Sequence, residues 1–324
     1  MQERLKQKAA ELLANGTVDR ILGWKAGEFF YDLTPAVFST AEDLEKDFVY
    51  NAFSGANLSK YCISESRKGG KVAVFLKPCD SYSFQQLLKE HRILRENVYI
   101  VGVQCDGKCD MEALRALGCE GVTAVREEGD TLTVETLYGN RTVCTEDVLL
   151  ERCKVCKSKR IVIYDELIGQ QGDEAPKADR FSEVSALEAM SPEERFDYWR
   201  SQLSKCIRCN ACRNVCPACS CEKCVFDNAD SGVRNKAAAD PFEENLFHII
   251  RAFHVAGRCT DCGECSRVCP QNIPLHLLNR KFIKDINELY GPYMAGADMD
   301  SKPAMLDYTT GDCEPSVVYE RGGK

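Results

Sequence analysis

Residues 206–217 read Cys-Ile-Arg-Cys-Asn-Ala-Cys-Arg-Asn-Val-Cys-Pro, and residues 259–270 read Cys-Thr-Asp-Cys-Gly-Glu-Cys-Ser-Arg-Val-Cys-Pro. In both stretches three cysteines are separated by two residues each, and a fourth follows after three more residues and precedes a proline. Three thiolates at this spacing can hold three corners of one 4Fe–4S cluster, while the fourth cysteine points to another cluster. Zinc sites use paired cysteines and do not need the final cysteine and proline. The repeat therefore predicts two 4Fe–4S clusters rather than zinc.

The spacing is that of bacterial ferredoxins, and it predicts how the eight cysteines divide between the two clusters. One cluster takes three cysteines of the first motif and the last of the second: Cys206, Cys209, Cys212 and Cys269. The other cluster takes the remaining four: Cys259, Cys262, Cys265 and Cys216.

The segment 217–258 between the motifs ends in a helical pattern over residues 246–257, and another helical pattern covers 274–290. A long helical insertion of this kind resembles the α-helical ferredoxin of succinate dehydrogenase and heterodisulfide reductase subunits. We expect His248 and His254 in the insertion to pack or to form hydrogen bonds rather than to bind metal. Three more cysteines, Cys219, Cys221 and Cys224, follow the first motif. They could hold part of an additional site, replace one of the ligands above, or be packed thiols.

The chain has 324 residues, a formal net charge of −8 and 20 cysteines. This length suits two domains, and the acidic balance, with a pI of 5.3, argues against nucleic-acid binding. No run of 18 apolar residues and no secretory signal is found, so we expect a cytoplasmic protein without a membrane span. In that compartment, so many cysteines indicate metal or redox chemistry rather than disulfides.

The first 170 residues predict an α/β domain with a mostly parallel sheet, because apolar strand patterns alternate with helical ones. The expected strands cover 18–24, 72–76, 98–103 and 161–164, and the expected helices cover 2–14, 81–94 and 111–117. Residues 121–144 predict a small antiparallel meander. We divide the chain into this α/β domain (1–170), a linker (171–192), a mainly helical two-cluster domain (193–293) and an extended C-terminal tail (294–324).

Four cysteines of the α/β domain stand next to predicted strands. Cys79 and Cys105 each follow a strand, and the pair Cys153 and Cys156 precedes one. Strand ends on one side of a parallel sheet converge, and α/β proteins place their sites there. These four cysteines therefore make one plausible 4Fe–4S site.

The order Lys77-Pro78-Cys79-Asp80, Gly102-Val103-Gln104-Cys105 and Cys153-Lys154-Val155-Cys156 resembles the beta-subunit family of deazaflavin-coenzyme-reducing hydrogenase and formate dehydrogenase. The resemblance covers residues 50–170 and implies a third 4Fe–4S cluster beside a flavin, with these ligands: Cys79, Cys105, Cys153 and Cys156. Cys109 is the alternative to Cys105 as a ligand of this cluster.

Two departures from that family accompany the resemblance. In the family the ferredoxin motifs lie on the N-terminal side, whereas here they follow the α/β domain. The family's flavin region has a Ser-Gly-Gly stretch, for which this chain offers Phe53-Ser54-Gly55-Ala56. The resemblance thus implies FAD at Ser54 and Gly55.

The expected function is that of an iron–sulfur electron-transfer subunit in a soluble anaerobic oxidoreductase complex. The resemblances imply a complex of the hydrogenase, formate dehydrogenase or heterodisulfide-reductase type, with catalytic subunits and a soluble electron carrier as partners. The alternative is a flavin-containing oxidoreductase that itself reduces a soluble carrier. We therefore expect a subunit that is non-catalytic or flavin-bearing, and a zinc-stabilised scaffold is the third reading.

Overall fold

The computed structural model describes residues 1–174, 178–227 and 241–304. Its N-terminal half is built on a five-stranded sheet with the order β2-β1-β3-β4-β8. These strands are β1 (Arg20–Ala26), β2 (Leu33–Phe38), β3 (Val72–Leu76), β4 (Val98–Val103) and β8 (Glu166–Ile168). β1, β3, β4 and β8 pair in parallel, and β2 joins the edge antiparallel to β1.

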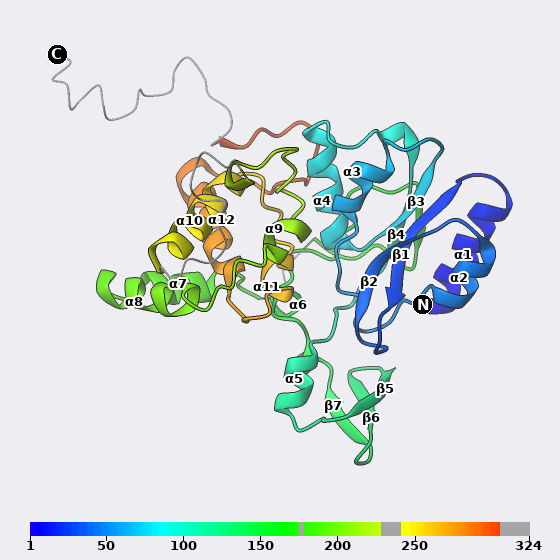
Figure 1. Ribbon diagram of the computed structural model, residues 1–324, viewed down its shortest axis with the longest axis horizontal. Coiled ribbons are helices and arrows are strands. Elements are labelled where there is room, and N and C mark those ends of the chain that lie inside the picture. Colours follow the sequence, from blue (N-terminus) through cyan, green and yellow to red (C-terminus); the bar gives the residue numbers. More distant parts are fainter. Residues whose placement is uncertain (175–177, 228–240, 305–324) are drawn as a thin grey trace.

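Helices cover both faces of this sheet, which explains why β3 and β4 are almost continuously apolar. Helices α1 (Gln2–Ala14) and α2 (Ala41–Asp47) lie on one face, and α3 (Cys62–Glu65) and α4 (Pro78–Lys89) lie on the other (Figure 1). Every residue of β3 is buried. Short 3-10 turns connect these elements: η1 (Ser59–Tyr61) and η2 (Arg95–Asn97).

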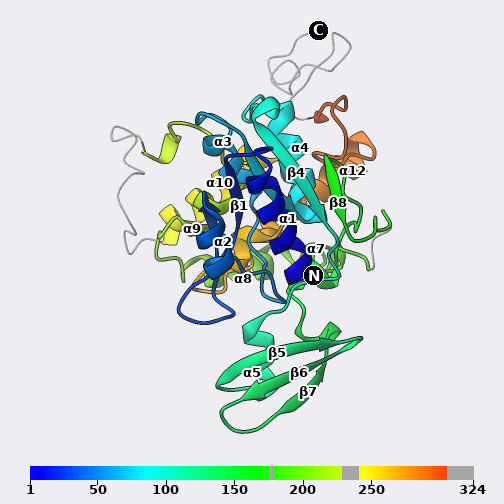
Figure 2. The same cartoon turned by 90° about the vertical axis from the view of Figure 1, so that its right-hand side faces the viewer.

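An antiparallel meander projects from the end of the molecule together with α5 (Met111–Ala116), as both views show (Figures 1 and 2). It comprises β5 (Val122–Glu128), β6 (Thr131–Thr136) and β7 (Arg141–Cys144), followed by η3 (Glu146–Val148). Leu114, Leu132 and Val134 are fully buried in its small core. Helix α6 (Glu151–Lys154) then returns the chain to the sheet.

The C-terminal half is helical and packs on the side of the sheet that carries α3 and α4 (Figure 1). Its elements are α7 (Ser182–Glu188), α8 (Pro192–Leu203), α9 (Ala211–Val215), η4 (Val225–Asp227), α10 (Pro241–Val255), α11 (Glu264–Arg267) and α12 (Leu275–Tyr290). Helix α8 begins with a capping box, in which Ser191 and Glu194 exchange hydrogen bonds. Within the described ranges, no helix is long and apolar enough to cross a membrane.

The predicted fold class is confirmed: the sheet is mostly parallel, the meander is antiparallel and the C-terminal half is helical. The strand predicted at 161–164 was wrong, since the strand lies at β8. The side chain of Gln171 binds both backbone groups of Ile161, and the N–H of Val162 donates to Ser81, so these groups are not available for a sheet ladder.

The expected linker and tail can be compared with the structure only in part. The segment 171–192 contains α7, where Val184 is buried. Of the tail expected at 294–324, residues 305–324 lie outside the described residues. The division into domains therefore stays a prediction.

Candidate metal centres

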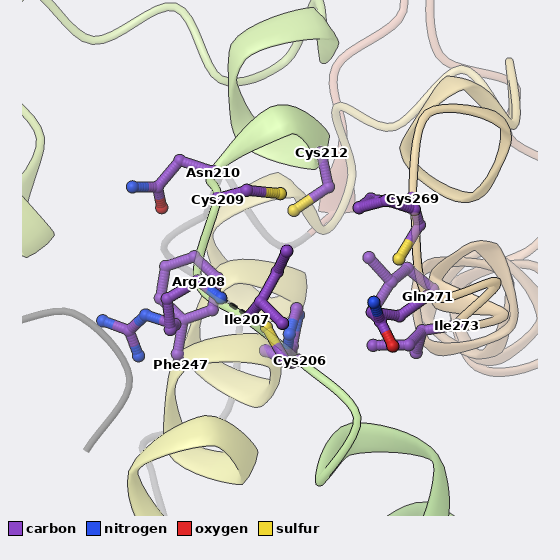
Figure 3. Close-up of a pocket in the computed structure, with 13 residues that line it drawn as sticks. Cys206, Ile207, Arg208, Cys209, Asn210, Cys212, Phe247, Cys269, Gln271 and Ile273 are labelled. Atoms are coloured by element: carbon purple, nitrogen blue, oxygen red, sulfur yellow. Dashed lines mark hydrogen bonds between the residues drawn. The ribbon is translucent and has the colours of Figure 1, made fainter. Parts of the chain in front are cut away.

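The first candidate centre is a cavity that four cysteines surround, and they are the four predicted for one cluster. Cys206, Cys209, Cys212 and Cys269 all line it. Figure 3 shows their side chains around the same space, with the first three coming from the loop before α9 and its first turn, and Cys269 from the segment after α11. The sequence repeat therefore brings together residues that are up to 63 positions apart (269 − 206).

The spacing of these sulfur atoms suits a cluster better than a single ion. A tetrahedral zinc site places its sulfur atoms about 3.8 Å apart, given Zn–S bonds of about 2.3 Å. In the part of the chain that the structure describes, no three of the four thiols have all their sulfur atoms within 4.8 Å of one another. The four thiols around this cavity are therefore a ligand set of the kind that holds a 4Fe–4S cluster.

The two motifs repeat each other in backbone conformation as well as in sequence. Arg208 and Asp261, at the third position of each motif, have φ angles of 52° and 53°. Asn210 and Gly263, at the fifth position, have φ angles of 61° and 64°. Left-handed conformations are unfavourable for residues with a Cβ atom. Their recurrence at equivalent positions therefore indicates that both loops have the same backbone shape.

One consequence of this loop shape is that backbone N–H groups face sulfur. The N–H of Arg208 donates to Sγ of Cys206 at 3.4 Å, and the N–H of Asp261 makes the equivalent bond to Cys259. Such bonds stabilise negative charge on sulfur. Burial acts in the opposite direction and raises the pKa of the Cys206 thiol to about 12, so a bound cation is needed to keep this thiolate.

The second candidate centre gathers the remaining four cysteines of the repeat. Cys216 packs in one small apolar cluster with Cys259. Burial raises the pKa values of Cys259, Cys262 and Cys265, and the nearby thiolate of Cys216 adds to each rise. Cys216 therefore interacts electrostatically with each of the other three thiols.

Arg251 of α10 lies between the first and second centres. It is 3% exposed, and one of its N–H groups donates to the carbonyl of Cys212 at 3.5 Å. Burial alone would lower the pKa of Arg251, but thiolates of both centres, Cys265 and Cys212 among them, raise it above its ordinary value. The buried guanidinium of Arg251 therefore interacts favourably with thiolates of both centres.

The three cysteines after the first motif lie on the wall of a separate cavity of about 930 Å³. The thiol of Cys219 donates a hydrogen bond to Cys216, which lowers the pKa of Cys216 below its ordinary value. Cys219 is therefore a neighbour of the second centre. Cys221 is exposed, and Cys224 bonds to Arg213.

The third candidate centre involves the cysteines of the α/β half. Cys79 lies in the first turn of α4, Cys105 follows β4, and Cys153 and Cys156 lie in and after α6. Burial raises the pKa values of Cys79 and Cys153, and the thiolate of Cys105 contributes to both rises. Cys105 therefore lies near both of them.

The alternative ligand Cys109 is placed differently from Cys105. It is 7% exposed in the apolar core that the meander shares, and its N–H donates to the carbonyl of Ala52 at 2.8 Å. Cys109 nevertheless interacts with Cys153, and burial raises its pKa to about 12. Cys105 is half-buried, so it is the more accessible of the two.

A buried ion pair fixes the start of α4, where Cys79 lies. Nζ of Lys77 binds Oδ2 of Asp80 at 2.7 Å and the carbonyl of Ala56 at 2.9 Å. The same ammonium lies over the ring of Trp24, 4.6 Å from its centroid. Because Lys77 and Asp80 are both buried, these contacts hold the first turn of α4, which carries Cys79, against the sheet.

Two cations connect the third centre to the second. Arg152, next to Cys153, donates to the carbonyl of Cys262 and forms an ion pair with Glu264. Lys157, next to Cys156, donates to the carbonyl of Thr260. Burial alone would raise the pKa of Glu264, but Arg152 and Arg267 outweigh it and lower the pKa to about 2. The second motif is therefore anchored directly on the third centre.

Ser54 and Gly55 lie at this interface and offer little to a flavin phosphate. Their N–H groups donate to the carbonyls of Asn51 and Phe53, and the Ser54 hydroxyl accepts from the N–H of Asn51. The carbonyl of Gly55 accepts from Arg152 at 2.6 Å. A phosphate needs free donors, so the geometry does not fit a flavin phosphate at these two residues, and FAD binding stays a prediction.

The functional residues that sequence reasoning missed are the charged and polar groups around the cysteines. Arg152, Lys157 and Glu264 were not singled out, although the cations flank the Cys153–Cys156 pair directly. His248 was expected to pack or to form hydrogen bonds, and it lines the first centre.

Comparisons with known proteins identify a domain in the helical half and similar proteins of comparable length. Residues 202–273 match the family model described as a 4Fe-4S dicluster domain. The F420-dependent formate dehydrogenase subunit beta of Methanocaldococcus jannaschii is 24% identical over 90% of this chain and 91% of its own. The F420-dependent formate dehydrogenase 1 subunit beta of Methanococcus maripaludis is 27% identical over 91% of this chain and 90% of its own.

Two other similarities are more limited. Lactate utilization protein B of Bacillus velezensis is 29% identical over 37% of this chain and 24% of its own. A chain of the F420-reducing [NiFe] hydrogenase complex from Methanosarcina barkeri covers 62% of this chain with 84% of its own, at 16% identity and a TM-score of 0.42.

The helical half thus contains a 4Fe–4S dicluster domain, and the protein is of the iron–sulfur class. Over nine-tenths of its length, the chain is homologous to the beta subunits of F420-dependent formate dehydrogenases.

Proposed function

We propose that this chain is an iron–sulfur electron-transfer subunit of an oxidoreductase complex of the formate dehydrogenase or hydrogenase type. The observation that carries the proposal is that three groups of thiols adjoin one another across the two halves. Arg152 and Lys157 connect the third centre to the second motif, and Arg251 interacts with thiols of the second and first centres. When bound, 4Fe–4S clusters supply reversible one-electron transfer.

The chain's own residues have three tasks in this proposal. The thiolates hold the clusters: Cys79, Cys105, Cys153 and Cys156 in the third centre, and the two groups of four from the repeat in the others. Backbone N–H groups of the two loops stabilise negative charge on sulfur. The buried cations Arg152 and Arg251 balance charge between neighbouring centres, where water is excluded.

The partners proposed are the catalytic subunits of such a complex and a soluble electron carrier. The printed names of the two full-length relatives describe subunits of formate dehydrogenases that depend on F420. Their similarity extends over nearly the whole chain, including the α/β half outside the dicluster domain. We place the complex in the cytoplasm, where thiols and clusters stay reduced.

Iron analysis of protein prepared without oxygen tests the proposal. We expect about 12 iron and 12 sulfide per chain, at four of each per cluster. Cys79→Ser and Cys156→Ser should each lower the iron content to about 8 and leave the electron paramagnetic resonance signals of the other two clusters unchanged, because each removes one ligand of the third centre. The matched control is Cys144→Ser, which changes an exposed thiol of β7.

Each possible result has a distinct meaning. Stoichiometric zinc with negligible iron would overturn the function as a whole. About 8 iron in the unchanged protein would remove only the third cluster. Full iron content in both Cys79→Ser and Cys156→Ser would show that these residues are not ligands.

A second candidate function is a flavin-containing oxidoreductase, and the 930 Å³ cavity favours it. The cavity lies between the two halves, and Lys60, Arg92 and Arg258 line it together with Tyr61 and Phe226. Cations beside aromatic rings suit a phosphorylated aromatic ligand. Release of flavin from the denatured protein, in a one-to-one ratio with the chain, would support this candidate, and its absence from fully iron-loaded protein would reject it.

A further inference from the structure

His248 occupies an unusual place in the first centre. It lies on α10, is 1% exposed, and lines the cavity that the four cysteines surround. One of its ring nitrogens, Sγ of Cys206 and a carboxylate oxygen of Glu244 lie within 4.8 Å of one another. Among the described residues, neither ring nitrogen of His248 has a hydrogen-bond partner.

A buried imidazole without partners is unfavourable, because its nitrogens lose their hydrogen bonds to water and gain none in exchange. The ring does pack edge-on against Phe247, 4.9 Å away between centroids, but this contact satisfies neither nitrogen. In either tautomer the ring keeps one N–H donor. An acceptor inside the cavity would satisfy that donor, and the sulfur atoms of a cluster are acceptors.

The second centre has a donor in a comparable relation to its thiols. Nδ2 of Asn279 on α12 donates to Sγ of Cys265 at 3.6 Å, and Asn279 is 3% exposed. Among the described residues, each centre of the dicluster domain therefore has a buried, uncharged side chain from a long helix that can donate a hydrogen bond: His248 of α10 for the first and Asn279 of α12 for the second.

We propose that His248 donates a hydrogen bond to the cluster of the first centre, that Asn279 does the same for the second, and that each donor raises the reduction potential of its own cluster. The proposal rests on the function proposed above. A cluster gains negative charge on reduction, so an N–H group directed at its sulfur atoms stabilises the reduced form more than the oxidised form. The two potentials are then set separately, by an imidazole in one centre and an amide in the other.

The test is a redox titration followed by electron paramagnetic resonance, on full-length protein prepared without oxygen. Cys209→Ser and Cys262→Ser first identify the signals of the first and second clusters. His248→Leu should then shift the midpoint of the first signal to a more negative potential and leave the second unchanged. Asn279→Leu should do the reverse, and iron content should stay at its original value in both variants.

Two further variants separate hydrogen bonding from packing. His248→Gln keeps an N–H donor and should retain most of the original midpoint, even if His248→Leu folds poorly. His254→Leu changes an exposed histidine of the same helix and should leave both midpoints unchanged.

Several results would overturn the proposal. An unchanged midpoint in His248→Leu would show that the ring donates no bond to the cluster. Loss of iron in both His248→Leu and His248→Gln would show that His248 is a ligand, as in a single-ion site with Cys206 and Glu244. If Cys209→Ser removes no signal, the ligand assignment of the proposed function fails instead.

Discussion

At the scale of the residue, Gly263 lies at a close contact between the two halves of the chain, where a Cβ atom would meet Arg152. It has the same left-handed backbone as Asn210 in the first motif. A Cβ atom at Gly263 would lie 2.9 Å from Cβ of Arg152 in the opposite half. The close approach of Arg152, rather than the backbone angle alone, therefore requires glycine here.

Exchanging the residues at positions 210 and 263 tests whether the contact with Arg152 requires glycine at position 263. Gly263→Asn introduces a residue that tolerates the left-handed conformation, so its effect reports the contact with Arg152. We expect the contact to destabilise the protein by about 1–3 kcal/mol, as overpacking does, and to lower the melting temperature of the iron-loaded protein. Asn210→Gly is the control and should melt near the original temperature. Equal melting of Gly263→Asn and the original protein would contradict the packing described.

The cysteines of the repeat could be predicted from the sequence because ligand spacing is a local property. The surrounding groups could not, because their roles depend on partners distant in the chain. Arg152 and Glu264 are 112 residues apart, and Asn57 and Glu264 are 207 apart. His248 shares its helical pattern with ordinary packing residues, so periodicity alone could not distinguish it.

At the scale of the element, the contact of α6 with α11 connects the two halves. Arg152 at α6 and Glu264 at the start of α11 are 8% and 2% exposed in their side chains. Arg267 also binds Glu264, with Nε at 2.7 Å from Oε1. Buried charges of this kind depend on each other, because removing one leaves the others unpaired.

Glu264→Gln should therefore destabilise the protein at neutral pH by about 3–5 kcal/mol, since Arg152 loses its buried partner. Thermal unfolding of the iron-loaded protein measures this as a lower melting temperature. Glu112→Gln removes an exposed ion pair with Arg115 and should change the melting temperature little. If the two variants melt alike, the Arg152–Glu264 pair does not hold the halves together.

Elements with long apolar patterns could be predicted, and those decided by side-chain hydrogen bonds could not. β3 and β4 coincide with their predicted ranges, and α12 begins one residue later than predicted. In these segments the spacing of the apolar residues and the length of the segment both indicate the same kind of element. β2 was not predicted, since it is a short edge strand that contains Pro35. Residues 161–164 have a strand-like pattern, but the side chains of Gln171 and Ser81 bind their backbone groups.

At the scale of the whole molecule, the chain carries a 4Fe–4S dicluster domain beside an α/β half, and parts of its described surface are apolar. The meander and α5 project from the body (Figure 2). α10 directs one side to the first centre and exposes Ile249 and Phe253 on the other. Exposed apolar side chains and a projecting meander are features that suit contacts with other chains.

We therefore expect the protein from its own host to have a native mass well above that of the 36.3 kDa chain, with formate dehydrogenase or hydrogenase subunits attached. Native mass spectrometry of the anaerobic protein measures this. A purified monomer that turns over a small-molecule donor at physiological rates without partners would contradict it.

The contacts of Arg152 and Lys157 have a consequence for biosynthesis. The thiols of the third centre are all translated by residue 156, but the partners of these two cations in the second motif, the Thr260 carbonyl and Glu264, follow 103 to 112 residues later. At about 5–20 residues per second, the ribosome needs roughly 5 to 20 seconds to supply them. During that interval the nascent chain holds four thiols beside two cations that lack their partners in the second motif. We expect the yield of intact protein to depend on how well oxygen is kept from the chain before translation ends.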